Sequence, residues 1–483
     1  MSQPSSTQPS TALWVRNLLF RLAVVGMLVA SFLIVRGLKE LAWPHGGHPA
    51  HDPLDHIVQW GAVVWVTILP WAIADVAGWL LYRRHTPVTM AARTRSGAPT
   101  MSNLVVFRIV TKGTQPAIVR ATVWSVLEAM EVRPLFPFRV EVVSDVPVPD
   151  LPDDPRVDPM VVPEDYATSN GATHKARALH YALTTSPVPD DAWVLHLDEE
   201  SHATEELVLG IRDAVADEER TGRHRIGQGL ITYQRDLSTN PVYSLADSIR
   251  VGDDLGRFHL QYRLHRILFG MHGSFLLVRA SVERQVGFDF PPEACTTEDT
   301  TWALHQMAAG NRFRWVEGTV VEQSPRTLGD FVRQRRRWFT GMWWSAQRTP
   351  VPARFRASLW LSMFLWTVGW TGFAYALLHV LSGVQVPGPL ADLGDGIFAV
   401  YLTNYLLGLW VSLAGRDALS GLRRLGFFVA QAVLIPLFAV IEASAVVYGL
   451  LRPERRFHVV DKPVIGSPGR AGVGGRVPVG DAV

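Results

Sequence analysis

The sequence predicts an α/β domain inserted between N-terminal and C-terminal transmembrane helices. Apolar runs occur near both ends of the 483-residue chain, and they are long enough to cross a bilayer, which takes roughly 20 residues per helix. Between them lies a polar interval in which short apolar runs alternate with helical patterns, as in a domain with a mainly parallel sheet. Seventeen tryptophans, many of them beside the apolar runs, are typical of membrane-interface belts. We therefore expect an integral, multi-pass membrane protein.

The N-terminal region is expected to carry two membrane spans. Residues 1–12 are rich in Ser, Thr, Gln and Pro and should be disordered. Residues 13–85 contain two apolar runs, at 18–38 and 57–82, and the second is followed by basic residues that the positive-inside rule places in the cytoplasm. No small-residue cleavage site follows the first run, and a second span comes soon after it, so a cleaved signal peptide is not expected.

The C-terminal region, residues 357–452, holds three further apolar runs, and its topology is ambiguous. Counted as three spans, the runs at 359–381, 397–413 and 425–451 would leave the tail, residues 453–483, outside the cell. That tail is basic, however, which the positive-inside rule assigns to the cytoplasm. Either the rule fails here, or the last run is broken near Pro436 and re-enters. We favour a cytoplasmic tail.

The polar interval, residues 100–350, is expected to form one domain. Strand patterns occur at residues 103–111, 138–144, 193–197 and 227–233, and helical patterns at 117–130, 173–183 and 205–219. Residues 146–165 are rich in Pro and Asp without periodicity and are interpreted as a loop. There is no dinucleotide-binding or Walker motif, which argues against a dehydrogenase or an ATPase. The net charge of +2 gives no reason to expect nucleic-acid binding. Cys295, the only cysteine, is expected to be a small buried or loop residue.

Three acids, Asp198-Glu199-Glu200, follow the apolar strand pattern at 193–197 without a break. A solvated acidic turn is the simpler interpretation of this run. The alternative is a metal-carrying turn at the carboxyl end of a strand, where open α/β sheets place their ligands. In an extended run Glu199 would point away from its two neighbours, so Asp198 and Glu200 are the candidate ligands.

Three other features each have a structural and a functional interpretation. Thr296 or Thr297 could cap a helix whose first turn holds Glu298 and Asp299, or Asp299 could act as a base. Residues 330–344, with four arginines and three tryptophans, could form an interfacial helix at the membrane. Lys175 could simply lie on a solvated basic face. Together, however, a cation site, arginines suited to phosphate and a separate carboxylate base describe sugar transfer from a nucleotide-sugar.

These elements resemble the signature of the family-two, processive-type glycosyltransferases, which include cellulose, chitin and hyaluronan synthases. The signature has four spaced elements, D, D-x-D, T-E-D and Q-x-x-R-W. They correspond in order to Asp145, Asp198-Glu199-Glu200, Thr297-Glu298-Asp299 and Gln334-Arg335-Arg336-Arg337-Trp338. The strand end, the run HGSFLLVR at 272–279 and QRRRW look closest to the egghead-type β-1,4-mannosyltransferases. Glu200 departs from the family, because many members carry Asp there, and Glu reaches further.

The resemblance implies a GT-A-like domain on the cytoplasmic face and an inverting transfer that forms a β-glycosidic bond. Asp299 would be the general base. Asp198 and Glu200 would bind Mg²⁺ or Mn²⁺ and, with Asp145 and Lys175, the nucleotide-sugar. The remaining matched residues would contact the acceptor and the diphosphate, namely Glu298, Gln334, Arg337 and Trp338. The egghead-like features favour GDP-mannose as donor and a lipid-linked or glycan acceptor, with membrane lipid as a further partner.

Other functions stay open at this point. A processive polysaccharide synthase would use UDP-glucose or UDP-N-acetylglucosamine, although about five spans are fewer than such synthases usually carry. A transporter with a cytoplasmic regulatory domain is a rival of another class. The apolar runs hold few ionisable residues apart from Asp75 and Glu442, which argues against a transport pathway. A sugar-binding module without catalysis would not need the separate base Asp299.

Overall fold

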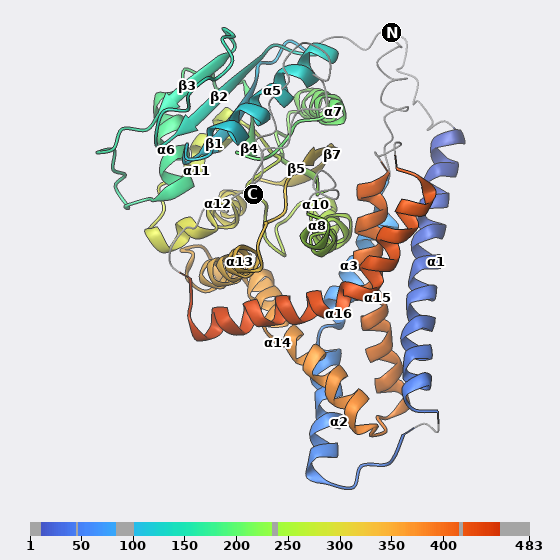
Figure 1. The fold of residues 1–483 in the computed structure, drawn as a ribbon. Helices are drawn as coiled ribbons and strands as arrows, with labels where there is room; N and C mark the ends of the chain where they lie inside the picture. The colour runs from blue at the N-terminus through green and yellow to red at the C-terminus, as the bar shows by residue number, and fades with distance from the viewer. Residues whose placement is uncertain (1–10, 45–46, 84–100, 234–239, 415–418, 455–483) are drawn as a thin grey trace, which may run out of the picture.

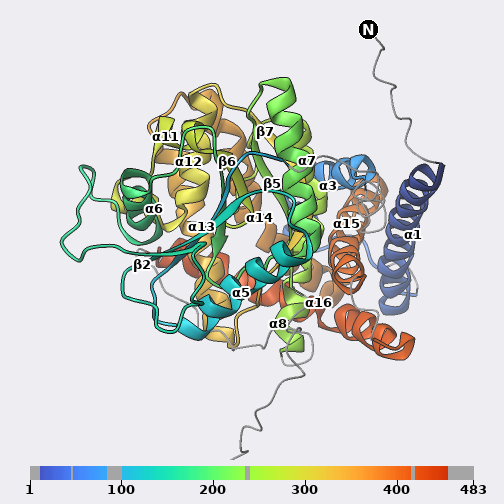
Figure 2. The same ribbon diagram turned by 90° about the horizontal axis from the view of Figure 1, so that it is seen from above.

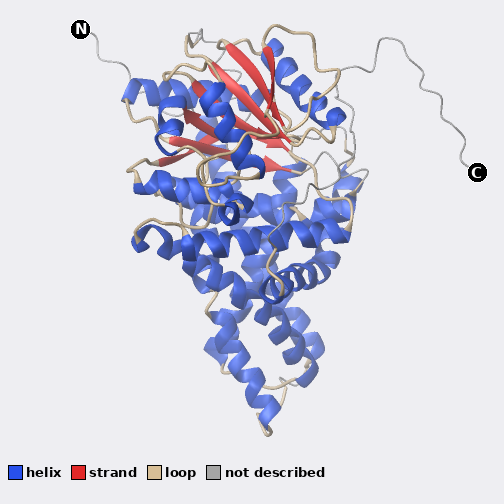
Figure 3. Cartoon of the chain, turned by 90° about the vertical axis from the view of Figure 1, so that its left-hand side faces the viewer, coloured by secondary structure: helices blue, strands red, loops and turns tan. Residues whose placement is uncertain are grey.

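The computed structural model describes residues 11–44, 47–83, 101–233, 240–414 and 419–454, and in this part of the chain an α/β domain sits on a group of long helices from both termini (Figures 1 and 3). Three expectations lie wholly or mostly outside the described residues: the disorder of residues 1–12, most of the basic flank after the second span, and the tail beyond residue 454. Of the first range only Thr11 and Ala12 are described, and they are helical, not disordered.

A seven-stranded mixed sheet forms the centre of the α/β domain. Its order is β3-β2-β1-β4-β6-β5-β7, and only β6 runs antiparallel to its neighbours within this sheet. The strands are β1 (Val105–Thr111), β2 (Phe138–Ser144), β3 (Val157–Val161), β4 (Trp193–Asp198), β5 (Ile226–Thr232), β6 (Leu276–Arg279) and β7 (Phe313–Val321). All residues of β1 and β5 are buried, which explains their continuous apolar patterns and confirms the prediction of a mainly parallel sheet.

The prediction of a structureless loop at residues 146–165 is wrong, because β3 lies within it. β3 is an edge strand that pairs with β2 alone, and it contains Pro159. A proline is tolerated on an edge because no partner needs its missing N–H. The strand is also only partly buried, so it lacks the apolar alternation by which strands are recognised.

Helices cover the sheet, and a further set follows β5. The helices of the α/β domain are α5 (Pro116–Val132), α6 (His174–Thr185), α7 (Glu205–Thr221), α11 (Ala280–Val286), the 3₁₀ helix η3 (Pro292–Thr296), α12 (Glu298–Ala308) and α13 (Leu328–Arg348). The helix α5 packs against β1 and α7 against β7, and these two helices touch (Figure 2). Cys295 is buried in η3, as expected of a small core residue, and burial raises the pKa of its thiol to about 11.

A chain of short helices after β5 docks the domain onto the apolar helices. These are α8 (Pro241–Ala246), α9 (Ser248–Asp253), the π-helical turn η2 (Asp254–Phe258) and α10 (His259–Arg263). The indole N–H of Trp79 donates a hydrogen bond of 2.9 Å to the carbonyl of Gly252. A Cβ at Gly78 would lie 1.8 Å from the carbonyl oxygen of Gly256, so only glycine permits this close approach. The sequence patterns gave no prediction for this segment.

The apolar helices come from both ends of the chain. They are α1 (Thr11–Ala42), α2 (Pro53–Val66), α3 (Leu69–Leu81), α14 (Ala353–Ser382), α15 (Gly388–Leu413) and α16 (Gly421–Leu451). Among the described residues, four stretches are long and apolar enough to cross a membrane: Leu13–Ala42, Pro53–Leu81, Gly388–Leu413 and Gly421–Leu451. The run at 359–381, expected to be a span, lies within the helix α14, which is not among these four.

The last apolar helix, α16, contains Pro436 in its interior. Figure 1 shows α16 bending, so that its second half runs beneath the α/β domain beside α13. Glu442 of this second half pairs with Arg335 of α13, and Gly449 lies next to the ring of Phe339. The last apolar run is therefore a bent helix and not a straight one.

Candidate active site

A cavity of about 500 Å³ extends from the carboxyl ends of β2 and β4 down between the apolar helices. All nine residues predicted from the sequence line it. They are Asp145, Lys175, Asp198, Glu200, Glu298, Asp299, Gln334, Arg337 and Trp338. The part next to the strand ends, with five of these acids, is called the acidic end. The part between α2, α14 and α15 is called the membrane end, and its lining includes Trp65, Ile68, Trp366, Gly369, Ile397, Phe398 and Val400.

The three acids after β4 divide between the cavity and the protein interior. Asp198 is the last residue of β4, and about a third of its side chain is exposed. Glu199 turns inward, where its carboxylate accepts a hydrogen bond from the hydroxyl of Thr111 on β1. Its carbonyl accepts another from Thr122, at 2.6 Å. Glu199 thus helps to fix the turn, which leaves the carboxylates of Asp198 and Glu200 at the acidic end.

Lys175, in the first turn of α6, connects the predicted metal-binding acid to the T-E-D element. Its ammonium forms an ion pair with Asp198, lies 3.8 Å from the carboxylate of Glu298, and donates to the carbonyl of Gly273 at 3.0 Å. A Cβ at Gly273 would lie 2.8 Å from Nζ of Lys175 and 3.2 Å from Oδ2 of Asp299. A side chain at Gly273 would therefore displace the ammonium of Lys175 from its place beside Asp198 and Glu298. Gly273 belongs to the HGS run, but nothing in that run indicates this packing role.

Glu298 and Asp299 lie in the first turn of α12, as the sequence predicted. Thr297 occupies the N-cap position but makes no capping hydrogen bond through its side chain, so the capping interpretation is wrong. A carboxylate oxygen of Asp299 instead accepts the backbone N–H of Thr300 at 2.6 Å. Burial and the neighbouring Asp299 raise the pKa of Glu298 to about 7. Burial also raises the pKa of Asp299, although Lys175 partly opposes this shift.

Asp145 directly follows β2 and forms an ion pair with an arginine of α6. Arg177 of α6 donates to its carboxylate at 2.9 Å. The same guanidinium donates to the carbonyl of Tyr166 at 2.9 Å, which fixes it against the loop before α6. One carboxylate oxygen of Asp145 is therefore held by Arg177 while the residue faces the cavity.

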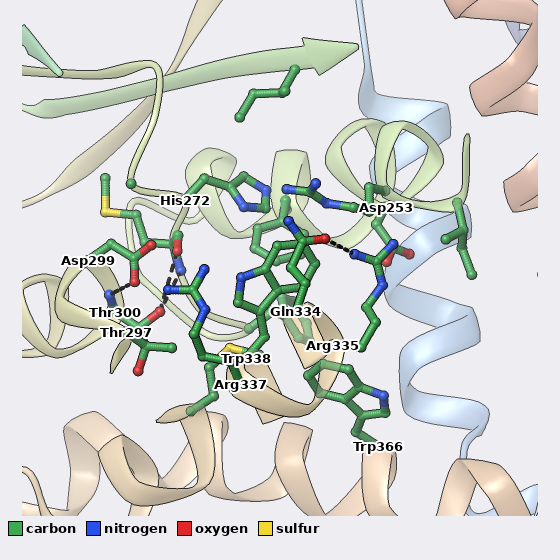
Figure 4. A pocket seen from close by; sticks show the side chains of 18 of the residues that line it. Asp253, His272, Thr297, Asp299, Thr300, Gln334, Arg335, Arg337, Trp338 and Trp366 are labelled. Atoms are coloured by element: carbon green, nitrogen blue, oxygen red, sulfur yellow. Dashed lines mark hydrogen bonds between the residues drawn. The ribbon is translucent and has the colours of Figure 1, made fainter. Parts of the chain in front are cut away.

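The three arginines of QRRRW point in different directions. Figure 4 shows Arg337 pointing towards Asp299 and Thr297, whereas Arg335 points away, towards Asp253. Residues two apart on a helix project about 200° from each other, which explains the divergence. Arg335 pairs with Asp247 and Glu442, and Arg336 pairs with Glu454. Within the motif, Arg337 is the guanidinium placed at the acidic end.

Trp338 and Gln334 line the middle of the cavity. The guanidinium of Arg250 lies 4.4 Å and that of Arg335 4.6 Å from the ring centroid of Trp338. The side-chain carbonyl of Gln334 accepts a hydrogen bond of 3.0 Å from Arg335. Two cations thus fix the indole in place, and a rigid aromatic ring is well suited to pack against a sugar. Arg250 was not predicted as part of the site, because it comes from a separate helix, α9, that carries no recognised motif.

Ion pairs form a layer between the acidic and the membrane ends. Arg257 pairs with Asp75 at 3.3 Å and also with Asp253, and Asn404 donates to Asp253 at 2.6 Å. The ion pairs of Arg335 complete this layer, which we call the ion-pair belt. Asp75 and Glu442, the two acids noted within apolar runs, therefore line the cavity as partners of arginines.

The carboxylates at the acidic end fit a divalent cation in chemistry. Within the described ranges, no group of three or more His, Cys, Asp and Glu side chains forms a metal site on its own. Asp198 and Glu200 nevertheless both face the cavity and provide the hard oxygen ligands that Mg²⁺ and Mn²⁺ prefer. A phosphate-bound cation usually takes few protein ligands and completes its shell with phosphate oxygens and water. Two cavity-facing carboxylates suffice for that arrangement.

A family model and several known proteins match this chain in sequence. Residues 193–414 match the family described as "Glycosyl transferase family group 2". The beta-1,4-mannosyltransferase egh of Drosophila melanogaster is 33% identical over 76% of this chain and 80% of its own length. The beta-1,4-mannosyltransferase bre-3 of Caenorhabditis briggsae is 32% identical over 82% and 86%.

Solved structures are more distant. The mannosyltransferase PcManGT from Pyrobaculum calidifontis, in complex with GDP-Man and Mn2+, is 14% identical over 81% of this chain and 100% of its own, with a TM-score of 0.41. S. aureus TarS 1-349 is 12% identical over 74% and 94%, with a TM-score of 0.28. These scores are too low for an inference about this chain.

The sequence matches define the class of protein, because they run through both the α/β domain and the apolar helices. The protein is a glycosyltransferase. It belongs to glycosyltransferase family 2, and its mixed α/β sheet is the GT-A-like fold that the resemblance implied.

Proposed function

We propose that this protein is a membrane-embedded, inverting mannosyltransferase that moves mannose from GDP-mannose to a lipid-linked acceptor. The observation that carries the proposal is the cavity itself. Its acidic end holds carboxylates and cations suited to transfer from a nucleotide-sugar, and the apolar lining of its membrane end comes mostly from two stretches long enough to cross a bilayer, Pro53–Leu81 and Gly388–Leu413. An acceptor with a sugar head and a lipid tail matches both ends. The donor rests on the printed activity of the relatives egh and bre-3.

The reaction uses the geometry at the acidic end. Asp299 accepts the proton of an acceptor hydroxyl, which attacks the anomeric carbon opposite the leaving diphosphate, so an α-linked donor gives a β-glycoside. Its carboxylate is held for this step by the N–H of Thr300. Arg337 and Lys175 offset the charge that develops on the diphosphate. Asp198 and Glu200 would hold Mg²⁺ or Mn²⁺, which would supply further positive charge at the leaving group when bound.

The membrane placement is part of the proposal. The protein is a multi-pass protein of the cell membrane with the catalytic domain in the cytoplasm, where nucleotide-sugars are found. The bend of α16 supports a tail on the same side as the domain, because the second half of α16 lies against α13. Reporter fusions at the C-terminus and in the loop between α1 and α2 test this. A reporter that is active outside the cell when fused to the C-terminus would contradict it.

The donor is tested by incubating the purified protein in detergent with Mn²⁺, a lipid extract and a panel of nucleotide-sugars, and measuring the released nucleoside diphosphate. We expect GDP from GDP-mannose, at a rate that increases with the lipid extract. Release from UDP-glucose or UDP-N-acetylglucosamine instead would support a polysaccharide synthase. No release from any donor would support the transporter with a regulatory domain.

A further inference from the structure

A second cavity, of about 620 Å³, lies where the first turns of α1 and the end of α3 meet the α/β domain. It shares no lining residue with the catalytic cavity. Four segments contribute to it: the start of α1, the end of α3, α10 with the turn after it, and the sheet around β5 and β7. The charged residues of its lining are Arg21, Arg83, Arg225, Arg263, Arg314 and Glu317.

The charges of this basic cavity are unevenly neutralised. Arg225 and Arg314 both pair with Asp217 and Glu218 of α7, so their charge is largely balanced. No carboxylate among the described residues pairs with Arg21, Arg83 or Arg263. The Nε of Arg21 is buried without a hydrogen-bond partner. A buried guanidinium nitrogen without an acceptor is unfavourable, and an anionic oxygen would satisfy it.

The two histidines of the lining both make hydrogen bonds with backbone carbonyls. The imidazole of His259 makes a hydrogen bond of 3.2 Å with the carbonyl of Gly78, and burial lowers its pKa to about 4, so it is neutral at pH 7. His265 makes a hydrogen bond of 2.7 Å with the carbonyl of Phe313. The available positive charge therefore comes from the three unpaired arginines, which belong to three different segments of the chain.

Apolar side chains of two membrane-length helices complete the lining. Leu13, Trp14 and Leu18 come from α1, and Leu81 from α3. Trp14 is 61% exposed, and Leu19 and Leu22, further along α1, are 59% and 57% exposed. Figure 1 shows α1 at the edge of the helix group, with its outer side uncovered. The basic cavity thus opens where an exposed apolar helix begins, which is the level of lipid headgroups if α1 spans the membrane.

We propose that this cavity binds the phosphate of an anionic membrane phospholipid, whose acyl chains lie along the exposed side of α1. The arginines match the phosphate, and the leucines and the indole match the first methylenes of the chains. A soluble phosphate would use only the arginines and would leave the apolar part of the cavity uncovered. The proposal depends on the membrane placement of α1 and not on the choice of donor or acceptor.

The test measures lipid binding to the full-length protein in neutral detergent. Short-chain phosphatidylglycerol, short-chain phosphatidylcholine and inorganic phosphate are titrated separately by calorimetry. We expect binding of phosphatidylglycerol, with clearly weaker binding of the other two. Equal binding of phosphatidylcholine would overturn the proposal, because the site would then not recognise negative charge. Equal binding of inorganic phosphate would also overturn it, because the source would then be a soluble anion.

Variants assign the binding to this cavity. The double variant Arg21→Gln/Arg263→Gln should bind phosphatidylglycerol roughly thirtyfold more weakly, at about 1 kcal/mol for each basic residue. Arg139→Gln, at an exposed position of β2 outside the cavity, is the matched control and should bind like the original protein. Should the double variant not fold, Arg83→Gln changes an exposed side chain and should lose roughly fivefold. Unchanged affinity in either variant contradicts the proposal.

Discussion

The acidic end and the ion-pair belt of one cavity hold their charges in opposite ways. The acidic end is lined by the five predicted acids and Glu199, together with the cations Lys112, Lys175 and Arg337. In the ion-pair belt, Arg257 and Arg335 each lie between two carboxylates at ion-pair distance. The acidic end can take up a cation and a proton, whereas each of the four belt carboxylates is already paired with an arginine and these pairs join helices. Acids and arginines thus face the cavity at the acidic end, whereas in the ion-pair belt they hold helices together.

The largest expected effect concerns the base. Asp299→Asn should lower kcat by up to about 10⁴-fold, because the amide cannot accept the proton of the acceptor hydroxyl. Donor binding should change little, since Asp198, Glu200 and Arg337 remain. Initial rates of GDP release together with calorimetry of donor binding check both parts. Asp150→Asn, at an exposed position on a loop, is the control. Near-normal turnover in Asp299→Asn would remove Asp299 from the mechanism.

Two arginines of α13 provide the sharpest contrast between acidic end and belt. Arg337→Gln should lower kcat by about 10²–10³-fold with little loss of stability, because its guanidinium faces the leaving group. Arg335→Gln should mainly destabilise, by about 3–5 kcal/mol, because Asp247 would stay buried without its partner. Thermal unfolding in detergent and kinetic measurements on both variants separate the two roles.

The control for this pair is Arg333→Gln, on the same helix. Its side chain is 46% exposed and pairs only with Asp330 at the helix start. It should change neither stability nor rate by much. If Arg335→Gln unfolded at the temperature of Arg333→Gln while losing activity, the ion-pair belt would be part of the catalytic machinery instead.

The difference between the acidic end and the ion-pair belt also explains which residues could be predicted from the sequence. Six of the nine predicted residues end or follow strands or open helices, and the other three share the helix α13, so each motif is local in the chain. The parallel strands then bring their carboxyl ends to the same edge. The ion-pair belt could not be predicted, since Asp75, Arg257 and Asn404 come from three distant helices with no motif of their own. Their association depends on the docking of α9 and η2 against α3 and α15.

The strands likewise divide into those that could be predicted from the sequence and those that could not. Strands β1, β2, β4 and β5 were predicted because burial makes them continuous apolar runs. β3 was missed for its proline and exposure, and β6 has only four residues, too few to show a period. The direction of Arg335 was also predictable in principle from its helical position relative to Arg337. Its partners Asp247 and Glu442 were not.

A smaller effect is expected from the predicted cation ligand. Asp198→Ala should weaken donor binding in the presence of Mn²⁺ by roughly 10–100-fold, the equivalent of one charge-assisted interaction. Without Mn²⁺ the difference between variant and original should shrink, because Asp198 then acts only through Lys175. Calorimetry with and without Mn²⁺ measures both values. Asp150→Asn, at an exposed position on a loop outside the cavity, is the control here as well. An equal loss with and without Mn²⁺ would remove Asp198 from the cation site.

The smallest effect is a shift in pH dependence. Asp299 must be deprotonated to act as a base, so kcat/KM falls as the pH drops through its pKa. Burial has already raised this pKa above the ordinary aspartate value, while the positive charge of Lys175 partly lowers it again. Lys175→Gln removes the opposing charge, so the acid limb of the kcat/KM profile should move to higher pH. Lys175→Arg keeps the charge and should leave the limb near its original position.

The rate at the optimum falls in both variants if Lys175 also holds the diphosphate, so only the position of the limb is diagnostic. A limb that did not move in Lys175→Gln would show that the charge of Lys175 does not influence the pKa of Asp299.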